Sequence, residues 1–317
     1  MKSLWLENNT LSLREVPVPQ NENEALVRVR LAGICGTDLE LIKGYYPFTG
    51  IPGHEFVGEV VSQPGSDQSL VGRRVVGEIN ASCGNCEQCL NGRHTHCENR
   101  TVLGIARRDG IFAEYTTLPV NNLHLVPDEI PDEMAVLTEP LAAAAEILEQ
   151  VHIHPSDRVL LIGAGRLGQL IAQTLTLSGA ALRVVARHPL QKQLLEKQNI
   201  RLIDEEDIQP WRWDVVVEAT GSTDGFLLAR KAIRPRGTLV LKSTYKGEIT
   251  VNLSSIVVDE INIVGSRCGS FEPALRLMQQ KLVDPSIINT REYRLADGLQ
   301  AFETAAERGV LKVLLRP

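Results

Sequence analysis

Three glycines that follow a short apolar segment place the strongest limit on how this chain can fold. Gly163, Gly165 and Gly168 form a G-x-G-x-x-G pattern between a strand-like segment and a helical one. Glycines at this spacing permit a tight turn and let backbone N–H groups approach a pyrophosphate at the helix N-terminus. The bare pattern is weak evidence, but in this context it predicts a dinucleotide site in place of an ordinary loop. The predicted loop contacts are Gly163, Gly165, Arg166, Leu167 and Gly168.

The segments around this loop alternate between strand-like and helix-like patterns. The strand-like segments are 158–162, 182–186, 214–217, 238–242 and 261–264, and the helix-like segments are 167–177, 189–197 and 226–233. Alternation of this kind predicts a parallel sheet with helices on both faces.

The first third of the chain has a different pattern. Short β-branched segments at 25–31, 55–61 and 73–79 are separated by glycine and proline. They predict a β-rich region, which Pro127 and Pro131 close before a helical stretch. A length of 317 residues agrees with two domains of ~150 residues each.

The composition narrows the class of protein. Hydrophobic residues make up 43% of the chain, so a core of ordinary size can form without disulfides. A net charge of -6 argues against a nucleic-acid surface. The sequence has no apolar run of ~18 residues, and its start lacks the basic and apolar parts of a signal peptide. We therefore expect a cytoplasmic protein that binds neither nucleic acid nor membrane.

Four of the six cysteines lie close together in the sequence. Cys83, Cys86, Cys89 and Cys97 form the pattern C-x2-C-x2-C-x7-C. Four thiolates in a tetrahedron suit Zn²⁺, and a cytosolic cluster of cysteines indicates metal binding. An iron–sulfur site is the alternative, although its fourth cysteine would usually come sooner and precede a proline. We predict a closed structural zinc site that stabilises the fold.

A second set of metal-binding residue types is scattered along the chain, at Cys35, His54, Glu55 and Glu139. One thiolate, one imidazole and a carboxylate would leave zinc with an open position, as Lewis-acid catalysis requires. Each residue alone is weak evidence, because a single cysteine beside glycine more often packs in a core and a His-Glu pair more often lies on the surface.

The combination of motifs resembles a known family. The stretches GICGTDLE, PGHEFVGEV, CGNCEQC, DGIFAEY, TEPLAAA and GAGRLG occur in the order found in the zinc-containing medium-chain dehydrogenase/reductase family. The resemblance implies a split, GroES-like β-rich catalytic domain over residues 1–145, completed by 268–317. It also implies a Rossmann-type, doubly wound parallel sheet over residues 146–267, with the active site in the cleft between the two domains.

The resemblance also implies roles for single residues. Cys35, His54 and Glu139 would surround a catalytic zinc, and Glu55 would be a ligand that exchanges with water or substrate. Thr37 would be the hydroxyl that contacts the alcohol and starts proton removal. Relatives often carry histidine at the outer end of this relay, where this chain has Glu40. The positions implied along the cofactor are Thr220, Gly221, Gly265 and Ser266.

The choice of cofactor depends on the end of the second strand of the βαβ unit. An acidic residue is expected there to hold the ribose 2′-hydroxyl of NAD. Ala186 occupies that position and Arg187 follows. A guanidinium pairs with a 2′-phosphate, whereas a carboxylate repels one. The segment favours NADP; the alternative is that Arg187 is a solvated surface residue and that NAD binds through other groups.

The sequence therefore predicts hydride transfer between an alcohol and NAD(P), with two zinc ions per chain. The substrate would be a primary or secondary alcohol, with polyols and amino alcohols included. Two rival functions stay open: a zinc-free enone or quinone reductase of the same fold, and a non-catalytic NADPH-binding sensor. A homodimer or homotetramer is implied by the resemblance alone.

Overall fold

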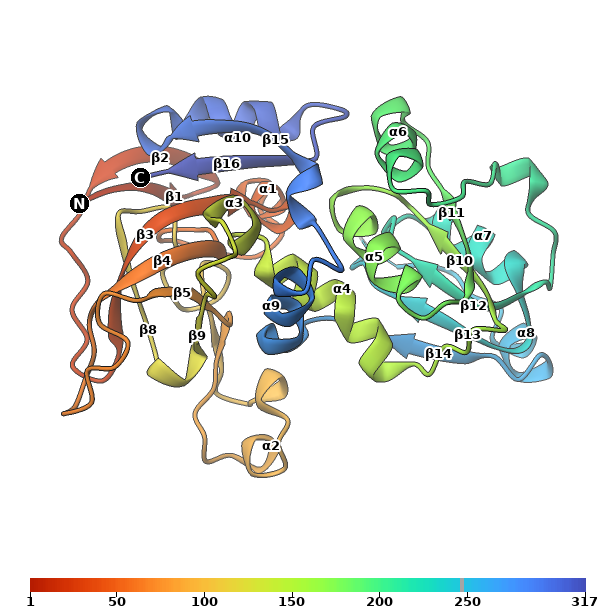
Figure 1. Cartoon of the computed structure of the whole chain (residues 1–317), viewed down its shortest axis with the longest axis horizontal. Helices are drawn as coiled ribbons and strands as arrows, with labels where there is room; N and C mark the ends of the chain where they lie inside the picture. The colour runs from red at the N-terminus through yellow and green to blue at the C-terminus, as the bar shows by residue number, and fades with distance from the viewer. Residues whose placement is uncertain (246–247) are drawn as a thin grey trace. The chain divides into compact units, whose positions relative to one another are not determined.

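The computed structural model describes residues 1–245 and 248–317, and the chain divides into two compact units (Figure 1). Unit 1 contains residues 1–139 and 271–317, and unit 2 contains residues 140–270. No helix among the described residues is long and apolar enough to cross a membrane.

Unit 1 is built on a seven-stranded sheet in the order β15-β16-β3-β4-β5-β9, with β8 paired to β3. Its strands are β3 (Ala25–Ile34), β4 (Glu55–Ser62), β5 (Arg74–Gly77), β8 (Tyr115–Leu118), β9 (Leu123–Leu125), β15 (Asn289–Arg294) and β16 (Lys312–Arg316). Smaller ladders join β1 (Lys2–Glu7) to β2 (Thr10–Glu15) and β6 (Asn80–Ala81) to β7 (Thr101–Val102). The β-rich first part of the chain is confirmed.

The helices of unit 1 are short. They are α1 (Gly36–Ile42), α2 (Glu87–Leu90), α3 (Asp132–Ala135), α9 (Phe271–Gln279) and α10 (Gly298–Ala306). The longer helix α4 (Thr138–Gln150) begins at the end of unit 1 and continues into unit 2.

The C-terminal strand completes the sheet of unit 1. Strand β16 pairs antiparallel with the end of β3, so that Val313 lies opposite Ile34 and Leu314 opposite Gly33. Val313, Leu314 and Leu315 are buried. This pairing places Lys312 beside the end of β3, where its Nζ donates to the carbonyl oxygen of Ile34.

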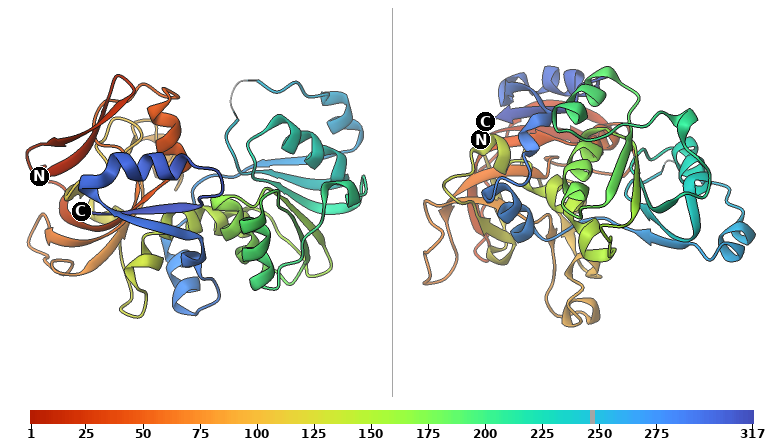
Figure 2. Two further views of the ribbon diagram at one scale, coloured as in Figure 1. Left: turned by 90° about the horizontal axis from the view of Figure 1, so that it is seen from above. Right: turned by 45° about the vertical axis from the view of Figure 1, so that its right-hand side comes forward.

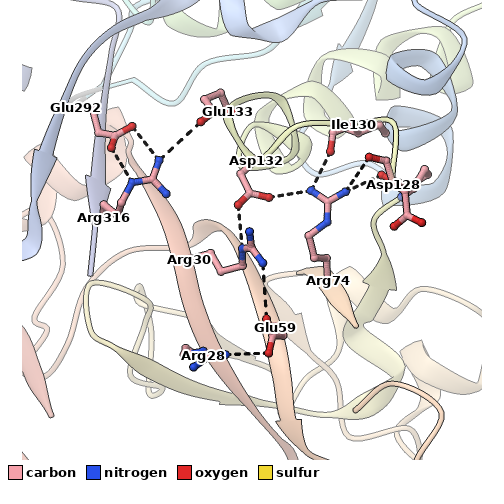
Figure 3. A network of polar contacts seen from close by, with 11 residues as sticks. Arg28, Arg30, Glu59, Arg74, Asp128, Ile130, Asp132, Glu133, Glu292 and Arg316 are labelled. Atoms are coloured by element: carbon pink, nitrogen blue, oxygen red, sulfur yellow. Dashed lines mark hydrogen bonds and ion pairs between the residues drawn. The ribbon is translucent and has the colours of Figure 1, made fainter. Parts of the chain in front are cut away.

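An ion-pair network fixes α3 on the sheet (Figure 3). Arg74 donates to Asp132 Oδ1 at 2.8 Å, and Arg30 donates to Asp132 Oδ2 at 2.9 Å. Arg74 also donates to the carbonyl oxygen of Ile130. Because Asp132 begins α3, its charge also interacts favourably with the helix dipole. The network therefore holds the start of the segment that leads to Glu139.

Unit 2 is a five-stranded, fully parallel sheet in the order β11-β10-β12-β13-β14. Its strands are β10 (Arg158–Ile162), β11 (Ala181–Val185), β12 (Trp213–Glu218), β13 (Ile233–Leu241) and β14 (Asn262–Gly265). Its helices are α5 (Arg166–Thr176), α6 (Pro189–Lys197), α7 (Thr223–Ala232) and α8 (Leu253–Val258). The predicted Rossmann-type sheet is confirmed.

The strand order of unit 2 reverses at β10. The chain moves from β10 to β11 in one direction and from β12 to β13 in the other. Because parallel crossovers are right-handed, α5 and α7 must cover opposite faces of the sheet, as Figures 1 and 2 show. Burial on both faces explains why residues 159–162 form an unbroken apolar run. Ligands of such sheets bind at the carboxyl ends of the strands, where the order reverses.

Candidate metal and cofactor sites

Cys35 lies at the junction between β3 and α1 in unit 1. It is the N-cap residue of α1, and its backbone N–H donates to Asp38 Oδ2 at 2.8 Å. The Thr37 hydroxyl lies 3.9 Å from the Cys35 sulfur. The helix start therefore places a thiol and a hydroxyl side by side.

The same carboxylate orients His54, which immediately precedes β4. Asp38 Oδ1 lies 3.3 Å from His54 Nδ1, and both side chains are almost fully buried. Burial lowers the pKa of His54, but the charge of Asp38 and the contacts with Asp38 and Cys35 together raise that pKa well above its usual value. A histidine that ligates metal typically gives its other ring N–H to a carboxylate. Asp38 fits this role, in which His54 Nε2 would be the atom available to a metal ion.

Glu55 completes a cluster of three potential ligands. One ligand atom from each of Cys35, His54 and Glu55 lies within 4.8 Å of the others. Glu55 Oε2 accepts a hydrogen bond from Lys312 Nζ at 2.5 Å, and both side chains are buried. Glu55 Oε1 is buried without a hydrogen-bond partner among the described residues. A buried carboxylate oxygen beside a thiol and an imidazole fits a bound zinc ion.

Two other predicted residues of this site, Glu139 and Glu40, are not in that cluster. Glu139 is in the first turn of α4 and is partly buried, and it is not part of the three-residue cluster. Glu40, on α1, accepts from Lys43 Nζ at 3.0 Å. The structure thus brings ligand atoms of Cys35, His54 and Glu55 within 4.8 Å of one another, and Glu139 is not in that group.

The four clustered cysteines come together in the lobe that carries α2. The Sγ–Sγ distances are 3.5 Å for Cys86–Cys89, 3.8 Å for Cys86–Cys97 and 3.5 Å for Cys83–Cys97. A tetrahedral zinc with Zn–S bonds of about 2.3 Å requires sulfurs about 3.8 Å apart. The arrangement of the four thiols therefore fits zinc.

Backbone N–H groups prepare two of these thiols for metal binding. A hydrogen bond from the backbone N–H of Asn85 is the largest of the effects that lower the pKa of Cys83 to about 6. The N–H groups of Cys89 and Glu98 lower the pKa of Cys86. Burial instead raises the pKa of Cys89 to about 11. Since thiolates are the ligands of zinc, metal binding to this lobe must release protons, most of all from Cys89.

In unit 2, each glycine of the glycine loop has a separate role. Gly163 has a φ of +104°, and a Cβ there would lie 2.8 Å from Thr220 Cγ2. A Cβ on Gly168 would lie 2.1 Å from the carbonyl oxygen of Gly163, so this glycine lets the helix approach the strand. A Cβ on Gly165, the N-cap of α5, would meet nothing within 4 Å. The space in front of Gly165 at the helix N-terminus fits a pyrophosphate.

A buried carboxylate organises the loop after β12. Glu218 is fully buried and accepts hydrogen bonds from the backbone and side chain of Thr220 and from the N–H of Gly221. The Tyr245 hydroxyl also donates to Glu218, and burial together with this carboxylate raises the pKa of Tyr245. Glu218 therefore fixes the conformation of the predicted cofactor contacts Thr220 and Gly221.

A buried lysine, Lys242, organises the segment after β14 from its place directly after β13. Lys242 donates to Ser266 Oγ at 2.9 Å and to the carbonyl oxygen of Arg267 at 2.7 Å. Ser266 is buried, whereas a Cβ on the preceding Gly265 would meet open space.

Four residues of these sites were not predicted from the sequence: Asp38, Glu218, Lys242 and Lys312. Only Asp38 could have been found there, because it lies within the motif GICGTDLE.

Arg187 lies just beyond the carboxyl end of β11. Its side chain is 59% exposed, and its Nε donates to Glu205 Oε1 at 2.9 Å. The side chain is thus positioned at the strand end where the adenosine ribose binds in folds of this kind, but it already has an acidic partner.

Comparison with known proteins identifies the family. The alcohol dehydrogenase GroES-like domain matches residues 21–128. The chain is 30% identical to D-arabinitol dehydrogenase 1 of Uromyces fabae over 348 residues, which covers 100% of this chain and 97% of that protein.

Two solved structures have the same fold. A putative zinc-binding dehydrogenase from Sinorhizobium meliloti bound to NADP has a TM-score of 0.92 at 28% identity, covering 100% of this chain and 99% of that one. The RspB alcohol dehydrogenase from Escherichia coli in complex with NADH has a TM-score of 0.90 at 27% identity, again covering 100% and 99%.

Fold and comparisons together define an NAD(P)-linked oxidoreductase of the alcohol dehydrogenase class. The chain belongs to the zinc-containing medium-chain dehydrogenase/reductase family, as its sequence motifs indicated.

Proposed function

We propose that the chain is a zinc-dependent alcohol dehydrogenase with one catalytic and one structural zinc, and that it prefers NADP to NAD. The observation that carries the proposal is the group of partly buried Cys35 with buried His54 and Glu55, in which Glu55 Oε1 has no hydrogen-bond partner among the described residues. The substrate class is primary or secondary alcohols, and polyols are the first to test, because the similar Uromyces protein is an arabinitol dehydrogenase.

Each residue of the catalytic site has a separate task in this proposal. Cys35 and His54 would hold the zinc, and one of the carboxylates Glu55 and Glu139 would complete the ligand set. When bound, zinc supplies a Lewis acid that polarises the substrate oxygen, and the nicotinamide exchanges the hydride. Asp38 keeps His54 in the required tautomer and orientation, since it faces Nδ1 at 3.3 Å.

Thr37 would remove the proton of the alcohol. Its hydroxyl lies 3.9 Å from the Cys35 sulfur and accepts and donates protons without a change in net charge. Beyond Thr37 the proton would pass to water, to a ribose hydroxyl of the cofactor or to Glu40, which takes the place of the usual histidine.

The preference for NADP rests on Arg187. We expect Arg187→Asp to lower the ratio of kcat/KM for NADPH over NADH by about 10- to 100-fold, because a charge-assisted hydrogen bond is lost and a repulsive carboxylate is introduced. Steady-state kinetics with both cofactors measure the ratio. An unchanged ratio in the variant would mean that Arg187 does not contact the 2′-phosphate.

The two rival functions make different predictions for simple assays. A zinc-free reductase would contain fewer than the two zinc ions per chain proposed here, which elemental analysis measures. An NADPH sensor would bind the cofactor but oxidise no alcohol in a broad panel of substrates with both cofactors. Turnover of a polyol by protein that contains two zinc ions supports the proposed function against both.

We also propose that the chain forms a homo-oligomer through the outer edge of the unit 2 sheet. Strand β14 ends the strand order and pairs only with β13 among the described strands. Next to it in sequence, Leu253, Val257 and Val258 on α8 are 70–79% exposed, and Ile263 on β14 is 44% exposed. An unpaired strand edge beside an apolar surface favours self-association about a two-fold axis.

A charge placed on this surface should break the oligomer. We expect Val257→Glu to raise the dissociation constant of the dimer at least about a hundredfold, because each interface would bury two unpaired carboxylates. Size-exclusion chromatography with light scattering measures the mass. Leu90→Glu is the matched control, since Leu90 is 76% exposed on the zinc lobe. A monomeric wild-type protein, or equal dissociation of both variants, would refute this interface.

A further inference from the structure

Arg187 and Glu205 meet because two strand-like segments lie side by side. Val184 of β11 forms a parallel bridge with Leu202. Arg187 lies three residues beyond Val184, and Glu205 lies three residues beyond Leu202, in a 3₁₀ turn at Glu205–Asp207. The pairing register therefore brings the guanidinium and the carboxylate to the same edge of the sheet, where their Nε–Oε1 distance is 2.9 Å.

Two acidic side chains, Glu205 and Asp224, act on Arg187. Glu205 raises the pKa of Arg187 through its hydrogen bond and its charge, and Asp224 in the first turn of α7 adds a smaller effect in the same direction. Glu205 thus contacts the guanidinium directly, and Asp224 acts on it through its charge. A phosphate that approaches Arg187 must share its N–H donors with Glu205 and is repelled by both acidic side chains.

We propose that Glu205 weakens the preference for NADP by competing with the 2′-phosphate for Arg187. The inference rests on the proposed role of Arg187 and names the residue that limits this role. Ala186 leaves the usual acidic position empty, and Glu205 supplies a carboxylate to the same strand end from a different segment. The chain then accepts NAD as well as NADP. The Glu205 carboxylate opposes binding of the 2′-phosphate of NADP and does not affect binding of NAD, which carries a 2′-hydroxyl instead.

The size of the effect follows from the exposure of the pair. The side chain of Arg187 is 59% exposed and that of Glu205 is 38% exposed. Exposed ion pairs change equilibrium constants by factors of about two to five. We therefore expect Glu205→Gln to lower the dissociation constant of NADPH by about two- to fivefold and to leave that of NADH unchanged.

The experiment measures binding in place of turnover. Dissociation constants of NADPH and NADH are obtained by fluorescence titration of the full-length, zinc-containing protein. The variants are Glu205→Gln, Arg187→Gln and the double variant. Asp204→Asn is the matched control, because it removes the same charge one residue away, where the carboxylate pairs with Lys192 at 3.1 Å.

Support requires tighter NADPH binding in Glu205→Gln, no change in Asp204→Asn, and a smaller gain when Arg187 is already glutamine. Weaker or unchanged NADPH binding in Glu205→Gln, or an equal gain in Asp204→Asn, would overturn the inference. If Arg187→Gln weakens NADPH binding while Glu205→Gln has no effect, only the inference fails. If Arg187→Gln leaves NADPH binding unchanged, both the inference about Glu205 and the proposed role of Arg187 in NADP binding fail.

Discussion

Replacing Cys35 by alanine is expected to lower kcat/KM for alcohol oxidation at least about a thousandfold, equivalent to ~4 kcal/mol of transition-state stabilisation. The reason is that the variant removes the only sulfur of the candidate catalytic cluster, which contains Cys35, His54 and Glu55. The melting temperature should change little, because Cys35 is only partly buried and the strand before it, β3, stays paired with β4, β8 and β16. Steady-state kinetics and thermal unfolding measure the two quantities.

Cys86→Ser is the control for this experiment. Cys86 lies 3.5 Å from Cys89 and 3.8 Å from Cys97 (Sγ–Sγ), so its loss should disrupt the closed zinc lobe and lower the unfolding temperature. Molecules of this variant that stay folded should keep their turnover. Equal loss of folding in both variants, or equal loss of turnover per folded molecule, would contradict the division into a catalytic and a structural metal.

Lys312→Met is expected to destabilise the protein by about 3–5 kcal/mol, because it leaves a buried carboxylate without its counter-charge. The side chains of Lys312 and Glu55 are 2% and 1% exposed, and Lys312 also donates to the carbonyl oxygen of Ile34 at 3.2 Å. Denaturant unfolding measures the loss of free energy. Replacing both partners, as in Lys312→Met with Glu55→Gln, should recover part of it, since the uncompensated charge is then absent.

The matched control is Lys192→Met on the surface of unit 2. Lys192 pairs with Asp204 at 3.1 Å, but both side chains are well exposed, so its loss should cost less than ~1 kcal/mol. If Lys312→Met cost no more than Lys192→Met, the buried pair of Lys312 and Glu55 would not stabilise unit 1.

Local patterns made much of this architecture predictable. The glycine loop and the strand–helix alternation fix the parallel sheet, because both depend on residues close together in sequence. The four-cysteine lobe is equally local, spanning Cys83 to Cys97. The hairpin of β1 and β2 was not predicted, although Asn8 and Asn9 adopt positive φ in its turn and such pairs favour two-residue hairpins.

Long-range pairings escaped prediction. Lys312 and Glu55 are 257 residues apart, and nothing near either residue signals the other. Strand β15 has the polar sequence NTREYR, which carries no clear strand pattern. Arg187 meets Glu205 only because of the register between Val184 and Leu202. Composition and residue spacing do not encode contacts between residues far apart in the sequence.

Zinc-edge anomalous diffraction from crystals of the full-length protein grown with zinc tests the central claim most directly. We predict two peaks per chain: one among the four clustered cysteines, and one about 2.3 Å from Cys35 Sγ and about 2.0–2.1 Å from His54 Nε2. The second peak would also show whether Glu55 or Glu139 completes the ligand set. A single peak in the cysteine lobe, with no metal at Cys35 and His54, would contradict the account.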